Sequence, residues 1–454
     1  MTNTAPAVEP SRPFDEIPEP PRAGLGGHLT EWLGIENAKD VLSRLLRYAQ
    51  RCGPVARVRL GPVNLCLVSD ATLAAAVLED PRANYKGASY ILTRAVLDNV
   101  LLLNGKEWER HRGEYKLALK DVDAVGSARA VTSRFVGETK SGALRLDQAV
   151  CQLVGDIAGD FTAGVGLGPE LEPHRRRIQY ELAGLGIDLQ CQPWAYLSPS
   201  RWVRLRQSVS AARAYFRAAV DTRMARPDES RKDILNGFLR LARAGQYPGD
   251  PESIQEGVVN FFFTAHDVLA SSVTWCLYLL ARHPEAQAEV RAALATGALD
   301  RDQIDACEPL ARVVRESLRL FPGYALFGRT TRAPMEIGGY RVPRGTLLIV
   351  SPFVTHRLER YWTRAESFLP SRWEGRATAP VVPVARDNYL PFGSGARGCL
   401  ASHLAVPILK TVVAHTLRGL ELHVPSGTPM PKISYWGTAY AEDGLPIEVR
   451  SLAS

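Results

Sequence analysis

The sequence has few cysteines for its length, and they are dispersed along the chain. The seven cysteines among 454 residues stand at positions 52, 66, 151, 191, 276, 307 and 399. No two have Cys-x-x-Cys spacing, so the sequence supports neither a zinc ribbon nor a dithiol redox site. So low a number is typical of a reducing cytoplasm. Six of the seven are expected to be small buried apolar residues.

The sequence also lacks a recognisable secretory or membrane-spanning segment. Residues 1–22 are rich in proline and acidic side chains, without the basic and apolar regions of a signal peptide, and we expect a flexible tail there. The most apolar internal stretch, Val258–Ala281, carries His266 and Asp267 near its middle, which favours a buried core helix. We therefore expect a cytoplasmic protein that does not bind a membrane.

The sequence also lacks a basic run that would suggest nucleic-acid binding, although the net charge is +7. A nucleic-acid-binding surface is therefore not indicated. What the sequence does have is the composition of an ordinary globular protein, with 46% hydrophobic and 23% charged residues. With neither repeats nor a linker, residues 23–454 are expected to form one domain, as a monomer.

Helical periodicity dominates this domain. From about Ala71 to Arg282 apolar residues recur at 3.6-residue spacing, and further helices are expected over Glu308–Leu320 and about Leu400–Gly419. Strands are expected within Pro54–Val68, within Arg329–Val350 and in a short C-terminal tail. The predicted fold class is mainly α with a smaller β part.

A Gly-rich loop with the sequence PFGSGARGCLAS, residues 391–402, precedes the last predicted helix. Its glycines permit positive φ angles and a close approach of the backbone to a flat ligand. The helix that follows would direct N–H groups at Cys399 and lower the pKa of its thiol. A thiolate is the electron-rich axial ligand that favours O–O cleavage at haem iron. Arg397 is placed to donate charge-assisted hydrogen bonds to a haem propionate.

This loop resembles the Phe-x-x-Gly-x-Arg-x-Cys-x-Gly haem loop of the cytochrome P450 family. The matching residues are Phe392, Gly393, Gly395, Arg397 and Cys399. One position departs, because Ala401 stands where the family has its closing glycine. The resemblance implies a cytochrome P450-like single domain with haem b (iron protoporphyrin IX) between a central helix and the cysteine-loop helix. It also implies Cys399 as the axial iron ligand, with Phe392 and Arg397 against the haem.

Two further motifs of the family concern the fold around this loop. Glu316 and Arg319 resemble its Glu-x-x-Arg helix, in which two side chains at i and i+3 share a face. Residues 368–373 (FLPSRW) resemble its Phe-x-Pro-x-Arg segment and contain Arg372. The resemblance implies that Glu316, Arg319 and Arg372 form a structural network and take no part in the chemistry.

Other arginines match family positions that hold the haem propionates. Trp108 and Arg112, at i and i+4, resemble the Trp-x-x-x-Arg helix. Arg329 stands where many members place another propionate-binding arginine. Three arginines opposite two carboxylates would make an anchor for the cofactor.

Residues 261–272 (FFFTAHDVLASS) resemble the central helix of the family, where an acid and an alcohol deliver protons. Asp267 matches the acid, but Val268 stands at the alcohol position and cannot relay a proton. Three arrangements stay open. A hydroxyl or amine of the substrate orders the water, or Thr264 one turn earlier takes over, or the reaction does not depend on well-coupled oxygen insertion.

The family's substrate-lining segments give a set of pocket candidates here, and the sequence does not identify one ligand from them. They are Phe263, Val268, Ala325, Phe327 and Trp436. A medium-sized, largely apolar natural product, of the kind made in secondary metabolism, is the expected substrate. Because no flavin or iron–sulfur domain is fused, electrons are expected from a ferredoxin or flavodoxin with its reductase. A basic patch of Arg110, Lys116, Lys120 and Arg386 is a possible docking face.

The sequence thus predicts a haem-thiolate monooxygenase. Within the family, the alternative is a non-inserting oxidation, such as coupling, desaturation or rearrangement, which Val268 would permit. An alternative of another class is a non-catalytic haem sensor or carrier. Such a protein would need no acid on the oxygen side, so Asp267 counts against it.

Overall fold

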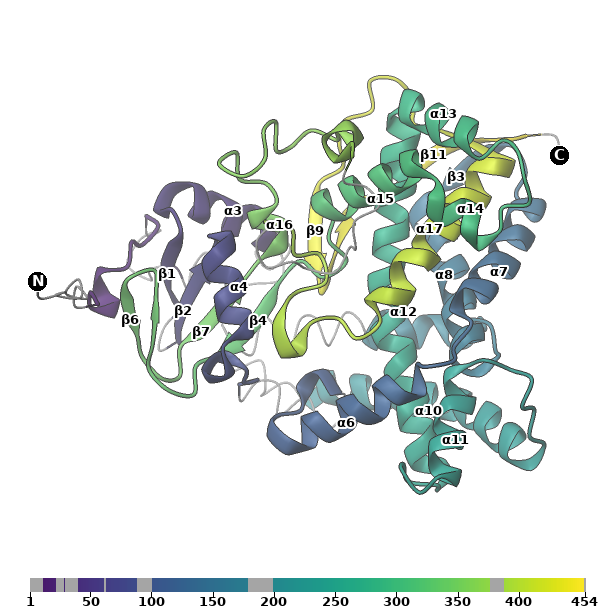
Figure 1. Cartoon of the computed structure of the whole chain (residues 1–454), viewed down its shortest axis with the longest axis horizontal. Coiled ribbons are helices and arrows are strands. Elements are labelled where there is room, and N and C mark those ends of the chain that lie inside the picture. Colours follow the sequence, from purple (N-terminus) through teal and green to yellow (C-terminus); the bar gives the residue numbers. More distant parts are fainter. Residues whose placement is uncertain are drawn as a thin grey trace, which may run out of the picture.

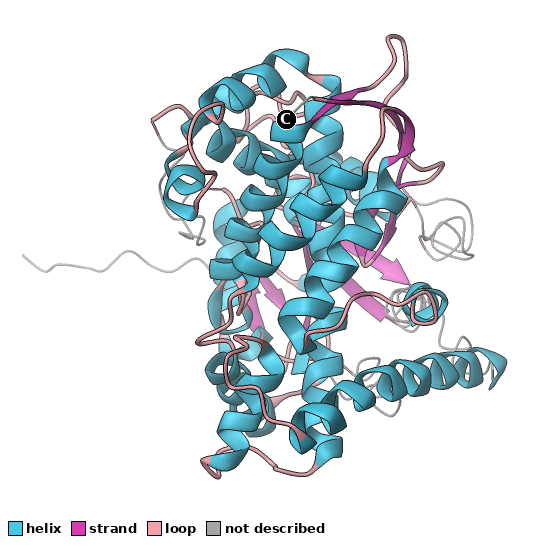
Figure 2. Ribbon diagram, turned by 90° about the vertical axis from the view of Figure 1, so that its right-hand side faces the viewer, coloured by secondary structure: helices cyan, strands magenta, loops and turns pink. Residues whose placement is uncertain are grey.

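The computed structural model of the chain describes residues 11–21, 28, 40–60, 63–87, 100–178, 199–375 and 388–452. A smaller part with most of the β structure contains the N-terminal region, and a larger helical part contains the C-terminal end (Figure 1). Helices dominate the molecule in the second view as well (Figure 2). The predicted fold class, mainly α with a smaller β part, is confirmed.

The larger part is built mainly of helices. They are α6 (Gly105–Ala118), α7 (Ala124–Glu138), α8 (Leu146–Ala163), α10 (Pro199–Ala225), α11 (Ile234–Arg243), α12 (Pro251–Arg282), α13 (Pro284–Ala293), α14 (Arg301–Ala306), α15 (Glu308–Leu320) and α17 (Ser402–Gly419). Three helices lie with the smaller part: α3 (Val41–Cys52), α4 (Ala71–Glu79) and α16 (Pro352–Thr355).

Helix α12 is the centre of the helical part. It packs against α8, α10, α11, α15 and α17, and its residues are buried on every side over much of its length. Asp250 caps its N-terminus by accepting a hydrogen bond from Ser253 N at 2.8 Å, with Pro251 at the first helical position. The helix ends at Arg282, and Pro284 starts α13, as expected from a proline that cannot continue the helix.

The largest sheet has the strand order β1-β2-β7-β4. Strands β1 (Val55–Leu60) and β2 (Val63–Val68) pair in antiparallel, within the range where strands are expected. Strand β7 (Leu347–Val350) pairs with β2 in parallel and with β4 (Phe327–Thr330) in antiparallel. The chain therefore returns to this sheet immediately after α15, which places the segment before β4 between the sheet and α12.

Three smaller sheets complete the β structure. They comprise β5 (Met335–Ile337) with β6 (Tyr340–Val342), β9 (Ile433–Trp436) with β10 (Thr438–Ala441), and β3 (Gly142–Arg145) with β11 (Pro446–Ser451) and β8 (Leu420–His423). Strand β3 does not follow from the sequence pattern. It has four residues and only one partner, β11, so its pairing depends on a segment about 300 positions away.

The described part of the N-terminal segment lies on the β structure. Arg12 N donates to Gly339 O at 2.8 Å, and the Arg12 guanidinium stacks on the Tyr340 ring. Ile17 is buried, and Arg57 on β1 pairs with Glu19. Residues 11–21, which fall within the range expected to be a tail, thus contribute to the packing of the smaller part.

Within the described ranges, no helix combines the length and the apolar character that crossing a bilayer requires.

Candidate functional site

The cysteine loop is built from glycine conformations that other residues rarely adopt. Gly393 has φ +69° and Gly395 has φ +67°, both in the left-handed region. A Cβ atom on Gly395 would lie 2.5 Å from Leu78 O, so the loop approaches α4 too closely for a side chain there. Cys399 N donates to Phe392 O at 2.9 Å and closes the loop.

Cys399 is exposed to solvent even though protein surrounds it closely. Burial raises the pKa of its thiol, and hydrogen bonds from the backbone N–H groups of Ala401 and Ser402 act in the opposite direction, as does the charge of Arg112. The expected N–H groups are therefore directed at the sulfur, but the expected lowering of the pKa is wrong for the free thiol. There the cost of desolvating a thiolate outweighs what the two donors contribute.

Two of the predicted arginines meet at Trp108 on α6. The Arg397 guanidinium lies over the Trp108 ring at 4.5 Å and the Arg112 guanidinium at 5.7 Å, measured to the ring centroid. Arg112 Nη2 donates to Gly398 O at 2.7 Å, one residue before the cysteine. Arg397 Nη2 donates to Leu103 O at 2.7 Å. Helix α6 and the cysteine loop are thereby joined.

Arg329 on β4 is buried close to the same group, together with a lysine that the sequence analysis missed. Lys86 is partly buried, and its Nζ donates to Gly328 O at 3.3 Å. Burial and the charges of Arg329 and Arg397 hold the pKa of Lys86 well below its usual value. No motif marks Lys86, because it follows a short bridge at Tyr85 and meets the arginines only through the fold.

These groups fit a haem on two independent counts. An accessible thiol stands at the start of a helix, as an axial thiolate ligand requires. Several cations converge beside it, close enough to perturb one another, where two propionates would supply the balancing negative charge. In the described ranges no cluster of three or more His, Cys, Asp or Glu side chains offers a different metal site.

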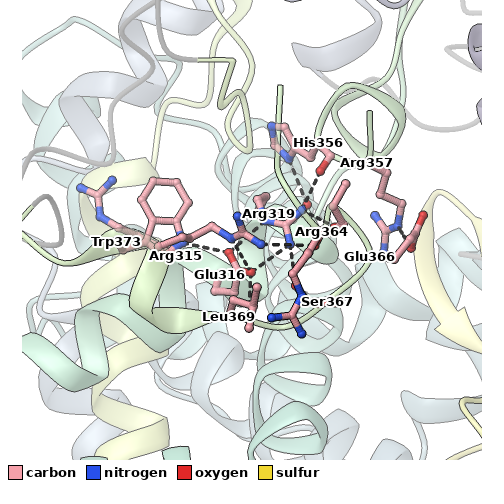
Figure 3. A network of polar contacts seen from close by, with 12 residues as sticks. Arg315, Glu316, Arg319, His356, Arg357, Arg364, Glu366, Ser367, Leu369 and Trp373 are labelled. Carbon is pink, nitrogen blue, oxygen red and sulfur yellow. Dashed lines mark hydrogen bonds and ion pairs between the residues drawn. The ribbon is translucent and has the colours of Figure 1, made fainter. Parts of the chain in front are cut away.

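The predicted structural network is assembled around Glu316 and Arg319, as Figure 3 shows. Glu316 and Arg319 are completely buried and form two hydrogen bonds of 2.9 Å. Arg372 Nε and Trp373 Nε1 each donate to Glu316 at 2.9 Å. Arg319 Nη1 also donates to His356 O at 2.7 Å. The three residues expected together do meet, and Trp373 and His356 join them.

The middle of α12 is partly exposed, in contrast to the buried residues 261–263 before it and 269–270 after it. Thr264, Ala265, Asp267 and Val268 are accessible in part, whereas His266 between them is completely buried. Positions 264 and 268 are one turn apart and share a face. The chain therefore leaves room beside that face of the helix, where the sequence analysis placed the oxygen side.

The carboxylate of Asp267 has two side-chain partners. Arg175, in the helical stretch 172–178, places Nη1 2.8 Å from Asp267 Oδ1. His266 Nδ1 lies 2.9 Å from the same oxygen. Neither partner followed from the motif, because Arg175 is 92 positions away and neighbouring residues of a helix do not normally face each other.

The pocket candidates connect α12 with the cysteine loop. A Cβ atom on Gly323 would lie 2.6 Å from Val268 Cγ1, so Val268 packs directly on this backbone. Four residues on, the Phe327 ring packs on Gly393, 3.2 Å from where a Cβ would be. The segment 323–327 thus contacts the central helix at one end and the loop at the other.

The remaining predicted positions are less informative. Ala325 is completely buried and Phe263 nearly so, with Phe263 set edge-on against Phe262. Trp436 ends β9, but its side chain lies outside what the structure describes, as does Arg386 of the predicted docking patch. Arg110 of that patch pairs with Glu114 at 3.0 Å.

Comparisons with known proteins agree with this arrangement. A family model described as Cytochrome P450 matches residues 188–445, more than half of the chain. Amorpha-4,11-diene 12-monooxygenase of Artemisia annua is 26% identical over 443 residues, which cover 92% of this chain and 88% of the relative. A germacrene A hydroxylase of Tanacetum parthenium is 24% identical over 452 residues, with coverages of 92% and 90%.

Solved structures with the same fold include two from Thermus thermophilus. A six-coordinated cytochrome P450 of this organism superposes with a TM-score of 0.69 at 23% identity and covers 90% of this chain and 98% of its own. CYP175A1, from another strain, gives a TM-score of 0.70 at 23% identity, with coverages of 90% and 95%. At this identity the likeness establishes the fold.

Proposed function

The chain belongs to the cytochrome P450 family, and we propose that it holds haem b through Cys399 and oxidises a small, largely apolar natural product. As a member of this family it is an oxidoreductase of the monooxygenase type. The observation that carries the proposal for the site is the accessible Cys399 thiol just before α17, beside a convergence of cations.

Cys399 is proposed as the axial ligand. The N–H groups of Ala401 and Ser402 that reach its sulfur would stabilise a thiolate, and binding a metal cation removes the thiol proton. A thiolate-ligated haem supplies the O–O bond cleavage that oxygen insertion requires. Phe392 fixes the position of the cysteine, since its carbonyl accepts the Cys399 N–H.

Five residues are proposed to hold the haem propionates: Trp108, Arg112, Arg329, Arg397 and, in addition, Lys86. The indole N–H and the guanidinium groups are strong donors to carboxylates. The support for Lys86 is its position near Arg329 and Arg397, whose charges act on its ammonium group. A propionate in contact with Lys86 would restore the ammonium form, which burial alone disfavours.

A carbon monoxide spectrum of the reduced, haem-loaded protein tests the ligand. We expect a strongly red-shifted Soret band, and we expect Cys399→Ala to lose it. Cys52→Ala is the matched control, because Cys52 is also a free cysteine but lies on α3, in the smaller part of the molecule. A normal band in Cys399→Ala would contradict the assignment.

Asp267 is proposed to feed protons to the oxygen side. It is the acidic side chain on the partly exposed middle of α12, where Val268 has no proton to give. Asp267→Asn is expected to reduce turnover sharply while haem content is retained. Unchanged turnover would leave Thr264 or a substrate hydroxyl as the relay.

The proposed substrate is apolar because the side chains between α12 and the cysteine loop are apolar, among them Val268 and Phe327. Two relatives are named for oxidation of amorpha-4,11-diene and of germacrene A. These two compounds are therefore suitable first probes in a screen for the low-to-high-spin shift that accompanies substrate binding. This substrate class would be contradicted if no apolar compound produced the spin shift and charged metabolites did.

Electrons are proposed to come from an external ferredoxin or flavodoxin with its reductase, in the cytoplasm. The described cysteines are free, as in a reducing compartment. Steady NADPH consumption with a ferredoxin system would separate this enzyme from a haem sensor.

One second function has a specific observation in its favour. Val268 at the alcohol position would suit a non-inserting oxidation, and products that lack oxygen from O₂ would establish it.

A further inference from the structure

The acid proposed to feed protons is held at one oxygen by two side chains. Arg175 Nη1 and His266 Nδ1 reach Asp267 Oδ1 at 2.8 and 2.9 Å. No hydrogen bond to Asp267 Oδ2 is found in the described part of the chain. The Asp267 side chain keeps 16% of its surface accessible, whereas Arg175 and His266 keep 4% and 1%. One carboxylate oxygen is thus anchored inside the protein.

The contacts of His266 define its charge. Its Nε2 lies 3.1 Å from the carbonyl oxygen of Cys151 on α8, and a carbonyl oxygen can only accept a hydrogen bond. Nε2 therefore carries a hydrogen. Nδ1 faces Asp267 Oδ1, which already accepts from the permanently charged Arg175. An acceptor in contact with a buried guanidinium is an ionised carboxylate, so Nδ1 carries a hydrogen as well.

We propose that His266 is a buried imidazolium that, together with Arg175, positions Asp267 by holding Oδ1 and leaves Oδ2 to exchange protons. This inference rests on the proposed function of Asp267. His266 is a positioning residue, because it is completely buried and acts through Asp267.

The surroundings of His266 balance its charge. Burial disfavours the cation, but the hydrogen bonds to Asp267 and Cys151 prevail, and the pKa of His266 is raised to about 9. Arg175 opposes the cation, and Glu172 compensates Arg175 through hydrogen bonds of 2.7 and 3.0 Å. The four side chains Glu172, Arg175, His266 and Asp267 carry two charges of each sign, and the largely exposed Arg176 also pairs with Glu172.

Aromatic packing also holds the ring of His266. Phe262, one turn earlier on α12, stacks on His266 with 5.6 Å between ring centroids and an angle of 27°. From α10, Phe216 packs on Phe262 at 5.0 Å. With the Cys151 carbonyl on α8 on another side, the ring orientation is fixed by three elements, and the orientation of Asp267 follows from it.

Nuclear magnetic resonance of the haem-loaded full chain, labelled with ¹⁵N-histidine, tests the charge directly. The protein is reduced and saturated with carbon monoxide so that the iron is diamagnetic. At about pH 8 an ordinary histidine is roughly 97% neutral. We expect one of the nine histidines to show hydrogens on both ring nitrogens, and His266→Asn to remove that signal. A bare ring nitrogen on His266 at this pH would overturn the proposal.

The same sample gives a second expectation. Asp267→Asn removes the carboxylate that sustains the cation, so the signal of His266 should become that of a neutral ring at about pH 8. His423→Asn is the matched control, because His423 is an exposed histidine on β8, far along the chain from the site. It should leave the signal of His266 unchanged. An imidazolium that persists in Asp267→Asn would show that Asp267 is not its partner.

Positioning is tested by the pH profile of a reaction that needs no redox partner. With hydrogen peroxide as oxidant and guaiacol as probe, the wild-type rate should fall as His266 loses its proton near about pH 9. His266→Asn keeps a neutral donor and His266→Leu keeps none. We expect both variants to react more slowly than the wild type and to lack the fall in rate at alkaline pH, which we call the alkaline limb. The rate of His266→Asn should be reduced less than that of His266→Leu. The same alkaline limb in all three proteins would overturn the positioning role.

Failure of this proposal and failure of the proposed function give different results. Loss of the red-shifted carbon monoxide band in the wild-type protein would count against the haem-thiolate function itself. A normal band together with a neutral His266 would count against the imidazolium alone.

Discussion

At the scale of single residues, the Val268 side chain packs against the backbone of Gly323. The valine stands where the family usually has an alcohol, and the glycine leaves space for it, since a Cβ at 323 would lie 2.6 Å from Val268 Cγ1. The same Cβ would lie 2.8 Å from Ser272 Oγ. The replacement of the alcohol is therefore part of the packing between α12 and the segment that leads to β4.

Val268→Thr should restore a proton relay without disturbing this contact, because valine and threonine have nearly the same shape. If productive oxygen insertion is limited by proton delivery, the share of NADPH that ends as hydrogen peroxide should fall several-fold. Val268→Ala is the control, since it changes the packing and adds no hydroxyl. Equal peroxide release from Val268→Thr and the wild type would favour a relay by substrate or a non-inserting reaction.

Gly395 allows a separate test of the cysteine loop. Gly395→Ala combines a left-handed φ of +67° with a Cβ 2.5 Å from Leu78 O. Gly427→Ala has a similar φ of +82° but nothing within 4 Å of the Cβ. The control should therefore lose only about 1–2 kcal/mol of unfolding free energy. Gly395→Ala should lose more and also retain less haem, measured by absorbance per protein. Equal haem content in both variants would contradict the close approach.

At the scale of secondary-structure elements, α15 is joined to residues 369–373 through a buried carboxylate, Glu316. Glu316 accepts from Arg319, Arg372, Trp373 and the backbone N–H of Leu369. These donors come from α15 itself and from the segment that follows residue 367. Because the carboxylate is completely buried, no water can replace it as an acceptor.

Glu316→Gln should accordingly cost about 3–5 kcal/mol of unfolding free energy, as loss of one partner of a buried ion pair does. Urea unfolding of the haem-loaded protein measures this. The control is Asp221→Asn, which breaks the exposed Arg217–Asp221 pair on α10 and should cost less than about 1 kcal/mol. If both variants lost a similarly small amount of unfolding free energy, the buried ion pair of Glu316 would be no more important for stability than an exposed one.

The elements that can be predicted from the sequence are those with local signals. The sequence predicts α15 over Glu308–Leu320, and the helix occupies those residues, because its apolar face is periodic and Phe321-Pro322 follows its end. The cysteine-loop helix is predicted from about Leu400 and begins at Ser402. Motif spacing likewise indicates Trp108, Arg112 and Arg397, which the structure brings together.

What could not be predicted depends on contacts between distant segments. Lys86 lies among the arginines because a loop before α6 folds against β4. Arg175 meets Asp267 across 92 positions. The pKa of Cys399 depends on how closely the whole site encloses the sulfur, whereas the motif shows only the donors. Each of these is a property of tertiary packing, and no residue pattern near the position encodes it.

At the scale of the whole molecule, two buried histidines have opposite charge states and opposite pKa shifts. His266 donates from both ring nitrogens and has a pKa raised to about 9. His356 receives the Leu390 N–H on Nε2 at 2.8 Å and faces Arg319 O with Nδ1 at 3.0 Å, so its ring is neutral with the hydrogen on Nδ1. Burial and the charge of Arg319 lower the pKa of His356 to about 3.

These two shifts predict a stability maximum near the ordinary histidine pKa of about 6.5. His266 binds its proton more tightly in the folded chain, so its contribution is complete below about pH 6.5 and is lost as the pH rises through about 9. His356 resists protonation in the folded chain, so its contribution is complete above about pH 6.5 and is lost as the pH falls toward about 3. Each limb can be as steep as about 1.4 kcal/mol per pH unit.

Urea unfolding of the haem-loaded protein between about pH 5 and pH 9 measures both limbs. His266→Asn should flatten the alkaline limb and leave the acid one, and His356→Gln should do the reverse, each with a lower maximum because a buried contact is lost. The selectivity of the two variants is the decisive result, since a general loss of packing would lower the whole curve without changing its shape. If both variants keep both limbs, other groups determine the pH dependence and the assigned charge of His266 loses its thermodynamic support.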